Sequence, residues 1–270
     1  MLAAMHVDGN ASSIHAEGRK ARKQMDDSRD KLAFHLGCLA PMLTFTSGGT
    51  EANNMALRGV AVDRILISAV EHPSVHAAAA ASGKPVEIIP VDHFGRVDLN
   101  ALEKMLSGPK ALVSVMFANN ETGVIQPIQD IVALVSKAGA LTHVDAVQAF
   151  GKTKVNFGLL GCDMMTVGAH KVGGPTGIGA LIIRDGLVVE PVLHGGGQEL
   201  RRRPGTENLI GMAGFAALTQ CAEINMQKLT SEIEHTLEGC TIFGQGAERL
   251  SNTIYFGHAG NARRNFVDEF

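Results

Sequence analysis

The chain has 270 residues and a formal net charge of −3, with 45% hydrophobic and 19% charged residues. This length corresponds to one large domain or two small ones and can bury a core without disulfides or metals. The negative charge, the absence of Trp and the single Tyr argue against a nucleic-acid binder. No apolar run approaches the roughly 18 residues of a membrane span, and the first residues lack the pattern of a signal peptide.

The four cysteines, Cys38, Cys162, Cys221 and Cys240, lie far apart and form no CxxC pair. This spacing is typical of reduced thiols and not of a disulfide framework or a zinc site. We therefore expect a cytoplasmic protein whose cysteines are buried apolar side chains.

Short apolar segments alternate with helical segments through the first 200 residues. This alternation predicts an α/β fold with a mainly parallel sheet and helices on both of its faces. The expected strands are Leu43–Thr46, Arg64–Ser68, Val86–Pro90, Ala111–Phe117, Leu141–Val144, Asp163–Val167 and Gly179–Arg184. The expected helices are His15–Leu36, Glu51–Gly59, Pro73–Ala81, Leu99–Leu106 and Ile128–Ala138.

The pattern changes after Pro204. Asn208–Leu237 predicts one long helix or two, and Cys240–Phe243 and Asn252–Phe256 predict two short strands. We therefore expect a large domain over residues 1–226 and the incomplete start of a small C-terminal α+β domain over residues 227–270.

Polar residues follow several of the expected strands, and ligands of parallel sheets bind at the carboxyl ends of the strands. Gly49 and Thr50 lie at a helix start, where free backbone N–H groups bind anions, although a simple helix cap explains them equally well. His72 and Asp145, taken singly, are explained as structural residues at helix starts. His72 and His76 have the spacing of a metal pair, but no third ligand follows, so we expect no metal site.

Lys171 adds an amine to this set. It precedes the glycine-rich stretch 172–179, where a lysine can act as a nucleophile or lie on the surface of a turn. An anion site, an imidazole, a carboxylate and an amine are together the groups that pyridoxal 5'-phosphate needs. Its phosphate binds a helix N-terminus, its aldehyde bonds to a lysine, and a carboxylate keeps its pyridine nitrogen protonated. The combination predicts this cofactor.

Six segments then resemble a known family in sequence, order and spacing. They are TSGGTEANN (46–54), EHPSV (71–75), NNETGVIQPI (119–128), HVDAVQAFGK (143–152), AHKVGGPTGIGAL (169–181) and HGGGQELRRRPGT (194–206). They look like the cysteine desulfurases of the class V aminotransferases, over about residues 9–260. The resemblance implies the fold of type I transferases that depend on pyridoxal phosphate.

The resemblance also implies roles for the matching residues. Lys171 would bind the cofactor's aldehyde and then act as general base, and His72 would stack on the ring and assist proton transfer. Asp145 would pair with the pyridine nitrogen, and Gln148 with the phenolic oxygen. Further implied contacts are the phosphate ligands Gly49, Thr50 and His170, Asn120 beside the ring and substrate carboxylate, and Thr206 at the phosphate of the neighbouring subunit.

The implied reaction removes sulfur from L-cysteine and gives L-alanine and a persulfide on an enzyme thiolate. Since the family forms dimers with shared sites, we expect a homodimer that passes sulfur to an acceptor such as an iron–sulfur scaffold protein. We expect no nucleic-acid or membrane partner.

The chain departs from the family pattern in four places. It lacks the Ser/Gly-rich loop with the catalytic cysteine, the arginine that binds the substrate carboxylate, and the usual first strand. Gly168 stands where the family generally has a phosphate-binding serine, and losing one hydroxyl weakens binding by about 1 kcal/mol. We therefore expect weak or no sulfur transfer by this chain.

Two alternatives stay open. The cofactor can support a selenocysteine lyase or another class V aminotransferase-like activity, which amino-acid profiling would separate. The missing segments and Gly168 also fit a non-catalytic homologue that acts only as a partner-binding dimer.

Overall fold

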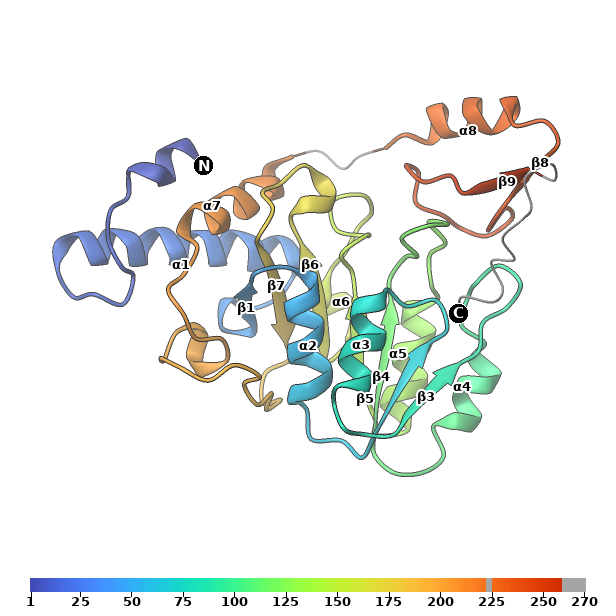
Figure 1. The fold of residues 1–270 in the computed structure, drawn as a ribbon, viewed down its shortest axis with the longest axis horizontal. Helices are drawn as coiled ribbons and strands as arrows, with labels where there is room; N and C mark the ends of the chain where they lie inside the picture. The colour runs from blue at the N-terminus through green and yellow to red at the C-terminus, as the bar shows by residue number, and fades with distance from the viewer. Residues whose placement is uncertain (222–224, 259–270) are drawn as a thin grey trace.

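The computed structural model describes residues 1–221 and 225–258, and its centre is a seven-stranded sheet (Figure 1). The strand order is β1-β7-β6-β5-β4-β2-β3, with β7 antiparallel to both neighbours and the other pairs parallel. The mainly parallel α/β fold is confirmed, and each expected strand end within this seven-stranded sheet lies within one residue of the observed one. The strands are β1 (Leu43–Thr46), β2 (Arg64–Ser68), β3 (Val86–Ile89), β4 (Ala111–Met116), β5 (Leu141–Asp145), β6 (Met164–Gly168) and β7 (Gly179–Ile183).

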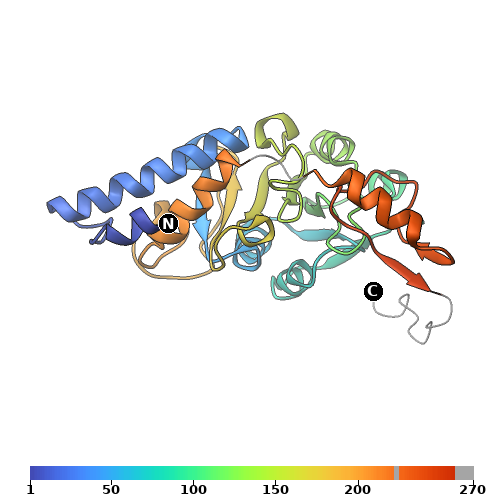
Figure 2. The same ribbon diagram turned by 90° about the horizontal axis from the view of Figure 1, so that it is seen from above.

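Helices cover both faces of the sheet, as expected (Figure 2). The helices α2 (Gly49–Gly59) and α3 (Pro73–Ala80) pack on one face. The other face carries α1 (Ala16–Leu36), α4 (Leu99–Met105), α5 (Ile128–Lys137), α6 (Phe157–Leu160) and α7 (Leu209–Ala217). Short 3-10 turns complete the connections: η1 (Leu2–His6), η2 (Ala40–Met42), η3 (His170–Val172), η4 (Glu199–Arg201) and η5 (Leu218–Gln220).

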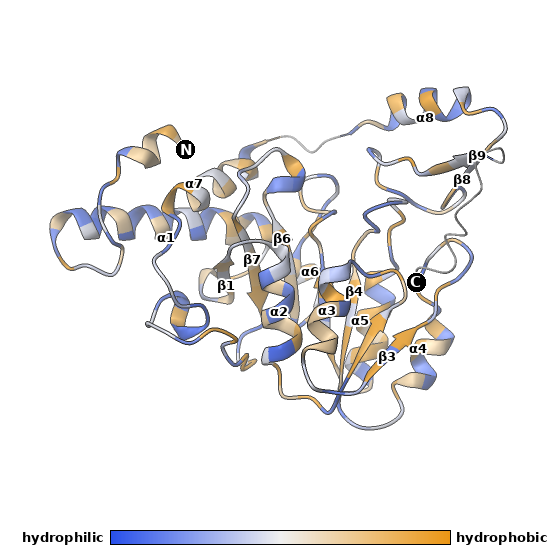
Figure 3. Ribbon diagram, viewed as in Figure 1, coloured by the Kyte–Doolittle hydropathy of each residue, from blue (hydrophilic) through white to orange (hydrophobic). Residues whose placement is uncertain are grey.

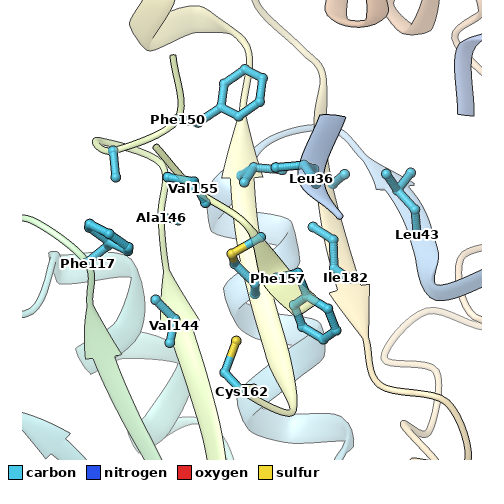
Figure 4. Close-up of a cluster of buried hydrophobic side chains, with 14 of the residues drawn as sticks. Leu36, Leu43, Phe117, Val144, Ala146, Phe150, Val155, Phe157, Cys162 and Ile182 are labelled. Atoms are coloured by element: carbon cyan, nitrogen blue, oxygen red, sulfur yellow. The ribbon is translucent and has the colours of Figure 1, made fainter. Parts of the chain in front are cut away.

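Except for β3, which is partly exposed, the strands of this sheet are buried and mostly apolar, whereas α1 is polar over much of its surface (Figure 3). Helix α1 buries Ala21, Met25, Leu32 and Leu36, whose spacing places them on one side of the helix. Gly37 ends α1 in the left-handed region, with a φ of 67° that favours glycine. Leu36 lies in the larger core beside side chains of the sheet and of α6 (Figure 4).

Beyond α7, the chain forms α8 (Gln227–Thr236) and an antiparallel hairpin of β8 (Cys240–Ile242) and β9 (Phe256–His258), at the upper right of Figure 1. The described residues between 208 and 237 form two α-helices, α7 and α8, with the 3-10 turn η5 directly after α7. The expected strand over residues 252–256 is wrong except for Phe256, because pairing with β8 sets the register of β9 at residues 256–258. Residues 259–270 of the expected small domain lie outside the described residues.

The expectation that all four cysteines are buried is wrong. Cys162 is buried, Cys38 and Cys240 are partly exposed, and Cys221 is exposed. Separately, none of the described helices combines the length and apolar character needed to cross a membrane.

Candidate active site

A pocket of about 380 Å³ lies at the carboxyl ends of the parallel strands. Lys171, after β6, and Asp145, at the end of β5, both line it, so the topology joins the amine and the carboxylate in one cavity. This edge is where open α/β sheets bind ligands, because the loops after neighbouring strands meet there. The pocket is lined by Ser47, Gly48, Gly49, Thr50, Glu51, Asn53, His72, Ser74, Met116, Ala118, Asn120, Asp145, Val147, Gln148, His170, Lys171, Thr176 and Gly177.

All the site residues expected from the sequence line this pocket except Thr206. Thr206 lies on the exposed loop between η4 and α7. Its expected contact is with a neighbouring subunit, so that contact stays a prediction.

The N-terminus of α2 forms one end of the pocket. Gly48 precedes the helix with a φ of 155°, a conformation that favours glycine, and the backbone of Gly49 and Thr50 begins the first turn. Free N–H groups at such a start attract anions. Glu51 lies in the same turn, but its carboxylate is paired with Arg203 (Nε to Oε1, 2.8 Å) and accepts from the Ser47 N–H. Burial opposes ionisation of Glu51, but these two partners together lower its pKa, so its negative charge is balanced at this anion-attracting end.

Asp145 lies at the buried floor of the pocket, where it is 6% exposed. Its Oδ2 accepts from Asn53 Nδ2 at 2.8 Å, and its Oδ1 accepts from the Val147 N–H at 3.0 Å. Burial raises the pKa of Asp145, against the effect of these two donors and of His72. In residues 1–221 and 225–258, no lysine or arginine forms an ion pair with this carboxylate.

A chain of hydrogen bonds connects Asp145 to His72. Asn53 on α2 also donates to Ser74 Oγ at 3.0 Å, and Ser74 Oγ lies 2.8 Å from His72 Nδ1. The Ser74 N–H donates to the same Nδ1 at 3.1 Å, which caps α3. Because Nδ1 accepts, the neutral imidazole carries its proton on Nε2. The network thus orients the His72 ring at the exposed rim of the pocket.

His143 lies one layer below the pocket and holds the central strands together. Its Nδ1 is 2.8 Å from Ser114 Oγ on β4, and its Nε2 is 2.9 Å from Thr166 Oγ1 on β6. Complete burial lowers its pKa to about 3, so the ring is neutral at physiological pH. This row of side chains therefore supports Asp145, two residues further along β5, without adding charge beneath it.

The part of the pocket rim that carries the Lys171 amine is exposed and positively charged. His170 and Lys171 lie on η3, directly after β6, and both side chains are exposed. Burial and then the charges of Lys171, His72 and Lys152 lower the pKa of His170. The arrangement places a buried acid at the floor and the exposed Lys171 amine at the rim.

Glu71 is a second buried carboxyl group near the floor, and it is 3% exposed. Its Oε1 accepts from Ser68 Oγ and from the Met116 N–H at 2.7 Å, whereas its Oε2 has no partner. Burial raises the pKa of Glu71 to about 8, although both donors oppose this and the charge of Asp145 adds to it. Glu71 is thus mostly protonated at neutral pH and links the loop before His72 to the end of β4.

We expect Glu71 to make stability depend on pH. The pKa of its carboxyl group is about 8 in the folded protein and about 4.3 in the unfolded chain. The contribution of Glu71 to the free energy of unfolding is therefore complete below the unfolded pKa, and it is lost as the pH rises toward the folded pKa. Urea unfolding should therefore show wild type losing about 3 to 4 kcal/mol relative to Glu71→Gln between pH 5 and 8. In the exposed-site variant Glu103→Gln, the free energy of unfolding should change with pH as it does in wild type. If Glu71→Gln also followed the pH dependence of wild type, this role of Glu71 would be contradicted.

The sequence did not indicate the supporting residues of the site. Asn53, Glu71 and Ser74 lie inside the segments that resemble the family, but no local pattern assigned them a function. One signal in the sequence pointed to Asn53, because it follows Gly49 by one helical turn and both residues therefore lie on the same side of α2.

The described residues include no group of three His, Cys, Asp or Glu side chains arranged to hold a metal ion.

Comparison with known proteins identifies the family. The model of the class-V aminotransferases matches residues 3–259. The chain is 39% identical to cysteine desulfurase IscS of Dictyoglomus turgidum and 40% identical to a cysteine desulfurase of Bradyrhizobium diazoefficiens. Each alignment covers 93% of this chain and 69% of the relative. The chain belongs to the cysteine desulfurase family.

Solved structures agree with this assignment. The NifS-like protein from Rickettsia africae superposes with a TM-score of 0.88 at 35% identity, covering 94% of this chain and 75% of that one. DndA from Streptomyces lividans superposes with a TM-score of 0.83 at 33% identity, covering 93% of this chain and 77% of that one. Cysteine desulfurases of the class V aminotransferases depend on pyridoxal phosphate, and the chain has their fold.

The pocket suits this cofactor in volume and in chemistry. Small-molecule sites commonly have volumes of roughly 300–1,000 Å³, and this one falls in that range. An unpaired buried carboxylate is expensive to ionise, and a protonated pyridine nitrogen would supply the missing positive partner of Asp145. The exposed Lys171 amine and the N-terminus of α2 match the two other polar ends of the cofactor.

Proposed function

We propose that this cysteine desulfurase family member acts on L-cysteine with pyridoxal phosphate held in the pocket described above. The Cβ–S bond would break, the sulfur would bond to an acceptor thiolate as a persulfide, and protonation at Cβ would give L-alanine. The observation that carries the proposal is that Lys171 and the unpaired, buried Asp145 line one cavity. When bound, the cofactor supplies an electron sink for charge that develops at the substrate's α-carbon.

Lys171 is the residue that we assign to covalent cofactor binding and to proton transfer. Its Nζ would hold the cofactor through the aldehyde, and it would also move the proton at the substrate α-carbon. An exposed lysine suits this role because it must exchange partners during each turnover.

Asp145 and His72 are assigned to the ring of the cofactor. Asp145 would hold a proton on the pyridine nitrogen, and its two hydrogen-bond donors keep the carboxylate oriented at the floor. His72 would lie against the ring face, in the orientation that Ser74 imposes.

The anionic groups of the ligands would bind around the rim. We assign the phosphate to the backbone of Gly49, to Thr50 and to His170, and the phenolic oxygen to the Gln148 amide. Asn120 would lie beside the ring and the substrate carboxylate. These assignments place the anionic groups beside hydrogen-bond donors, namely the N–H groups that begin α2 and the polar side chains that line the pocket.

The acceptor thiol is proposed to come from outside the described pocket. All four cysteines are in the described part of the chain, and none of them lines the pocket. Burial raises the pKa of Cys38 to about 11 and, together with Asp163, raises that of Cys162 to about 12, so neither is a thiolate at neutral pH. We therefore propose that a thiol other than Cys38 and Cys162 receives the sulfur, which then passes to an acceptor such as an iron–sulfur scaffold protein.

The function is tested by incubating the purified protein with pyridoxal phosphate, L-cysteine and an added dithiol. We expect slow formation of L-alanine and sulfide in equal amounts, without a keto acid and dependent on the dithiol, in line with the weak sulfur transfer expected from the sequence. Alanine that forms only when a keto acid is consumed would indicate an aminotransferase instead. A stable, folded protein that binds no cofactor would overturn the proposal.

Assembly and location are also proposals. We propose a homodimer in which the exposed Thr206 reaches the phosphate site of the neighbouring subunit. We propose that residues 1–226 form the cofactor-binding domain and that residues 227–270 begin a smaller one. The cytoplasmic location stays a prediction from cysteine usage.

Gly168 gives a test of the phosphate site. A Cβ at this position would lie 3.6 Å from His170 Nδ1 and from Val147 Cγ1, an ordinary contact distance, so a serine fits without displacing its neighbours. We expect Gly168→Ser to bind pyridoxal phosphate about fivefold more tightly, since one added hydrogen bond contributes about 1 kcal/mol. Gly168→Ala has the same Cβ without the hydroxyl and should show no gain in equilibrium dialysis. Equal affinities for the serine and alanine variants would contradict the expected hydroxyl–phosphate contact.

A further inference from the structure

Lys152 lies next to the candidate active site but does not line the pocket. It is half-buried in the turn that follows β5, and its Nζ donates to Gln148 Oε1 at 2.7 Å. Backbone hydrogen bonds from Lys152 N and Thr153 N to Ala149 O shape this turn. Gly151, with a φ of 72°, supplies the left-handed conformation that the turn needs just before Lys152.

The chemistry of this bond determines the orientation of the Gln148 amide. A glutamine amide carries an acceptor oxygen and a donor NH₂ group, and it can present either of them to a ligand. A lysine ammonium group only donates, so it can bond only to the oxygen. With Oε1 engaged by Lys152, the Gln148 Nε2–H groups remain as the amide's contribution to the pocket.

We propose that Lys152 is a positioning residue that fixes the Gln148 amide as a hydrogen-bond donor toward an anionic oxygen of the bound cofactor. The inference rests on the proposed function, because it needs the cofactor in this pocket. It adds to that function the residue that sets the polarity of the Gln148 contact.

The surroundings of Lys152 are consistent with this role. Burial first and the charge of Lys171 second lower the pKa of Lys152, so placing its ammonium group here is unfavourable without a partner. No carboxylate forms an ion pair with it among the described residues, and the Gln148 oxygen is the acceptor that the structure provides. The unfavourable burial of the Lys152 ammonium group would be offset by the stronger cofactor contact of the oriented Gln148 amide.

A double-mutant cycle on cofactor binding tests the proposal. The dissociation constant of pyridoxal phosphate and the absorbance maximum of the bound form are measured for wild type, Lys152→Met, Gln148→Ala and the double variant. We expect Lys152→Met and Gln148→Ala each to weaken binding about tenfold. The double variant should be no weaker than Gln148→Ala, because Lys152 acts through Gln148.

Two further variants complete the experiment. Lys152→Arg retains a donor and should restore both the affinity and the absorbance maximum, whereas Lys154→Met removes the same charge from an exposed site and should change neither. Additive losses in the double variant would overturn the proposal, because Lys152 would then act by charge alone. Unchanged binding in Lys152→Met would also overturn it and would leave the proposed function standing. If the wild-type protein itself binds no cofactor, the proposed function and this inference both fail.

Discussion

In the Lys171→Ala variant, we expect complete loss of covalent cofactor binding and of alanine formation. The residue lies on η3 at the rim of the pocket, and its amine is the one lysine nitrogen that lines the cavity in the described part of the chain. Without it, no protein amine can bond to the aldehyde at this site, and none can move the proton at the substrate α-carbon. Wild type mixed with pyridoxal phosphate should show an absorbance change on binding that the variant lacks.

Borohydride reduction and peptide mass spectrometry provide an independent readout. The cofactor should be attached to the wild-type peptide that contains Lys171, and Lys154→Ala, at an exposed lysine outside the pocket, should be labelled equally well. Circular dichroism of Lys171→Ala should match wild type, since the exposed lysine makes no contact that holds the core. An unchanged spectrum with cofactor in Lys171→Ala, or labelling at another lysine, would refute the assignment.

The Glu199→Ala variant should lose about 3 to 5 kcal/mol of unfolding free energy, the usual effect of removing one partner of a buried ion pair. Glu199 forms a two-pronged pair with Arg29 on α1, in which Nη1 lies 2.9 Å from Oε2 and Nη2 contacts Oε1. The Phe45 N–H donates to the same carboxylate at 2.8 Å. The side chains are only 13% and 2% exposed, so alanine at position 199 leaves the Arg29 charge buried without its partner.

The same pair holds an unusual stretch of backbone. Glu199, Leu200 and Arg201 have φ angles of 47°, 57° and 66°, in the left-handed region that side chains disfavour. This stretch leads to Arg203, which pairs with Glu51 at the anion end of the pocket. We therefore expect Glu199→Ala to weaken cofactor binding as well, because the loop that carries Arg203 is released.

Urea unfolding monitored by circular dichroism measures this loss. Asp27→Ala breaks the exposed Lys23–Asp27 pair on the same helix and should cost at most about 1 kcal/mol. Replacing both partners, as in Arg29→Met with Glu199→Leu, should recover most of the stability, since it removes the buried charge altogether. A loss for Glu199→Ala no larger than that for Asp27→Ala would show that this pair does not hold the loop.

The fold and the chemical groups at the strand ends were predictable because they follow from local patterns. Runs such as Ala111–Met116 and Gly179–Ile183 are mostly apolar, as expected of strands that are buried on both faces, and turns separate them from their neighbours. Once the strands are parallel, their carboxyl ends share one edge, so Gly49, Asp145 and Lys171 were expected near one another before any coordinates. The short strand at residues 252–256 was misplaced because a two-stranded hairpin carries little periodicity and takes its register from its partner.

Pairings between distant polar side chains were not predictable. Asn53 meets Asp145 across 92 positions, and Arg29 meets Glu199 across 170, so no window of the sequence contains both partners. The exposure of Cys221 and the buried state of Glu71 were missed for the same reason. Each depends on which helix or loop covers the residue.

By itself, the sequence determined the alternation of strands and helices, the glycine at each tight turn and the chemical groups at each strand end. These depend on backbone propensity and on apolar periodicity, which act over a few residues. Only the tertiary structure decided that Asp145 is buried with no lysine or arginine paired to it in the described part of the chain. It also decided that Glu71 is buried near Asp145 and that Lys152 engages the oxygen of Gln148. Those properties arise from desolvation and from hydrogen-bond geometry, and both are set by the packing of segments far apart in the chain.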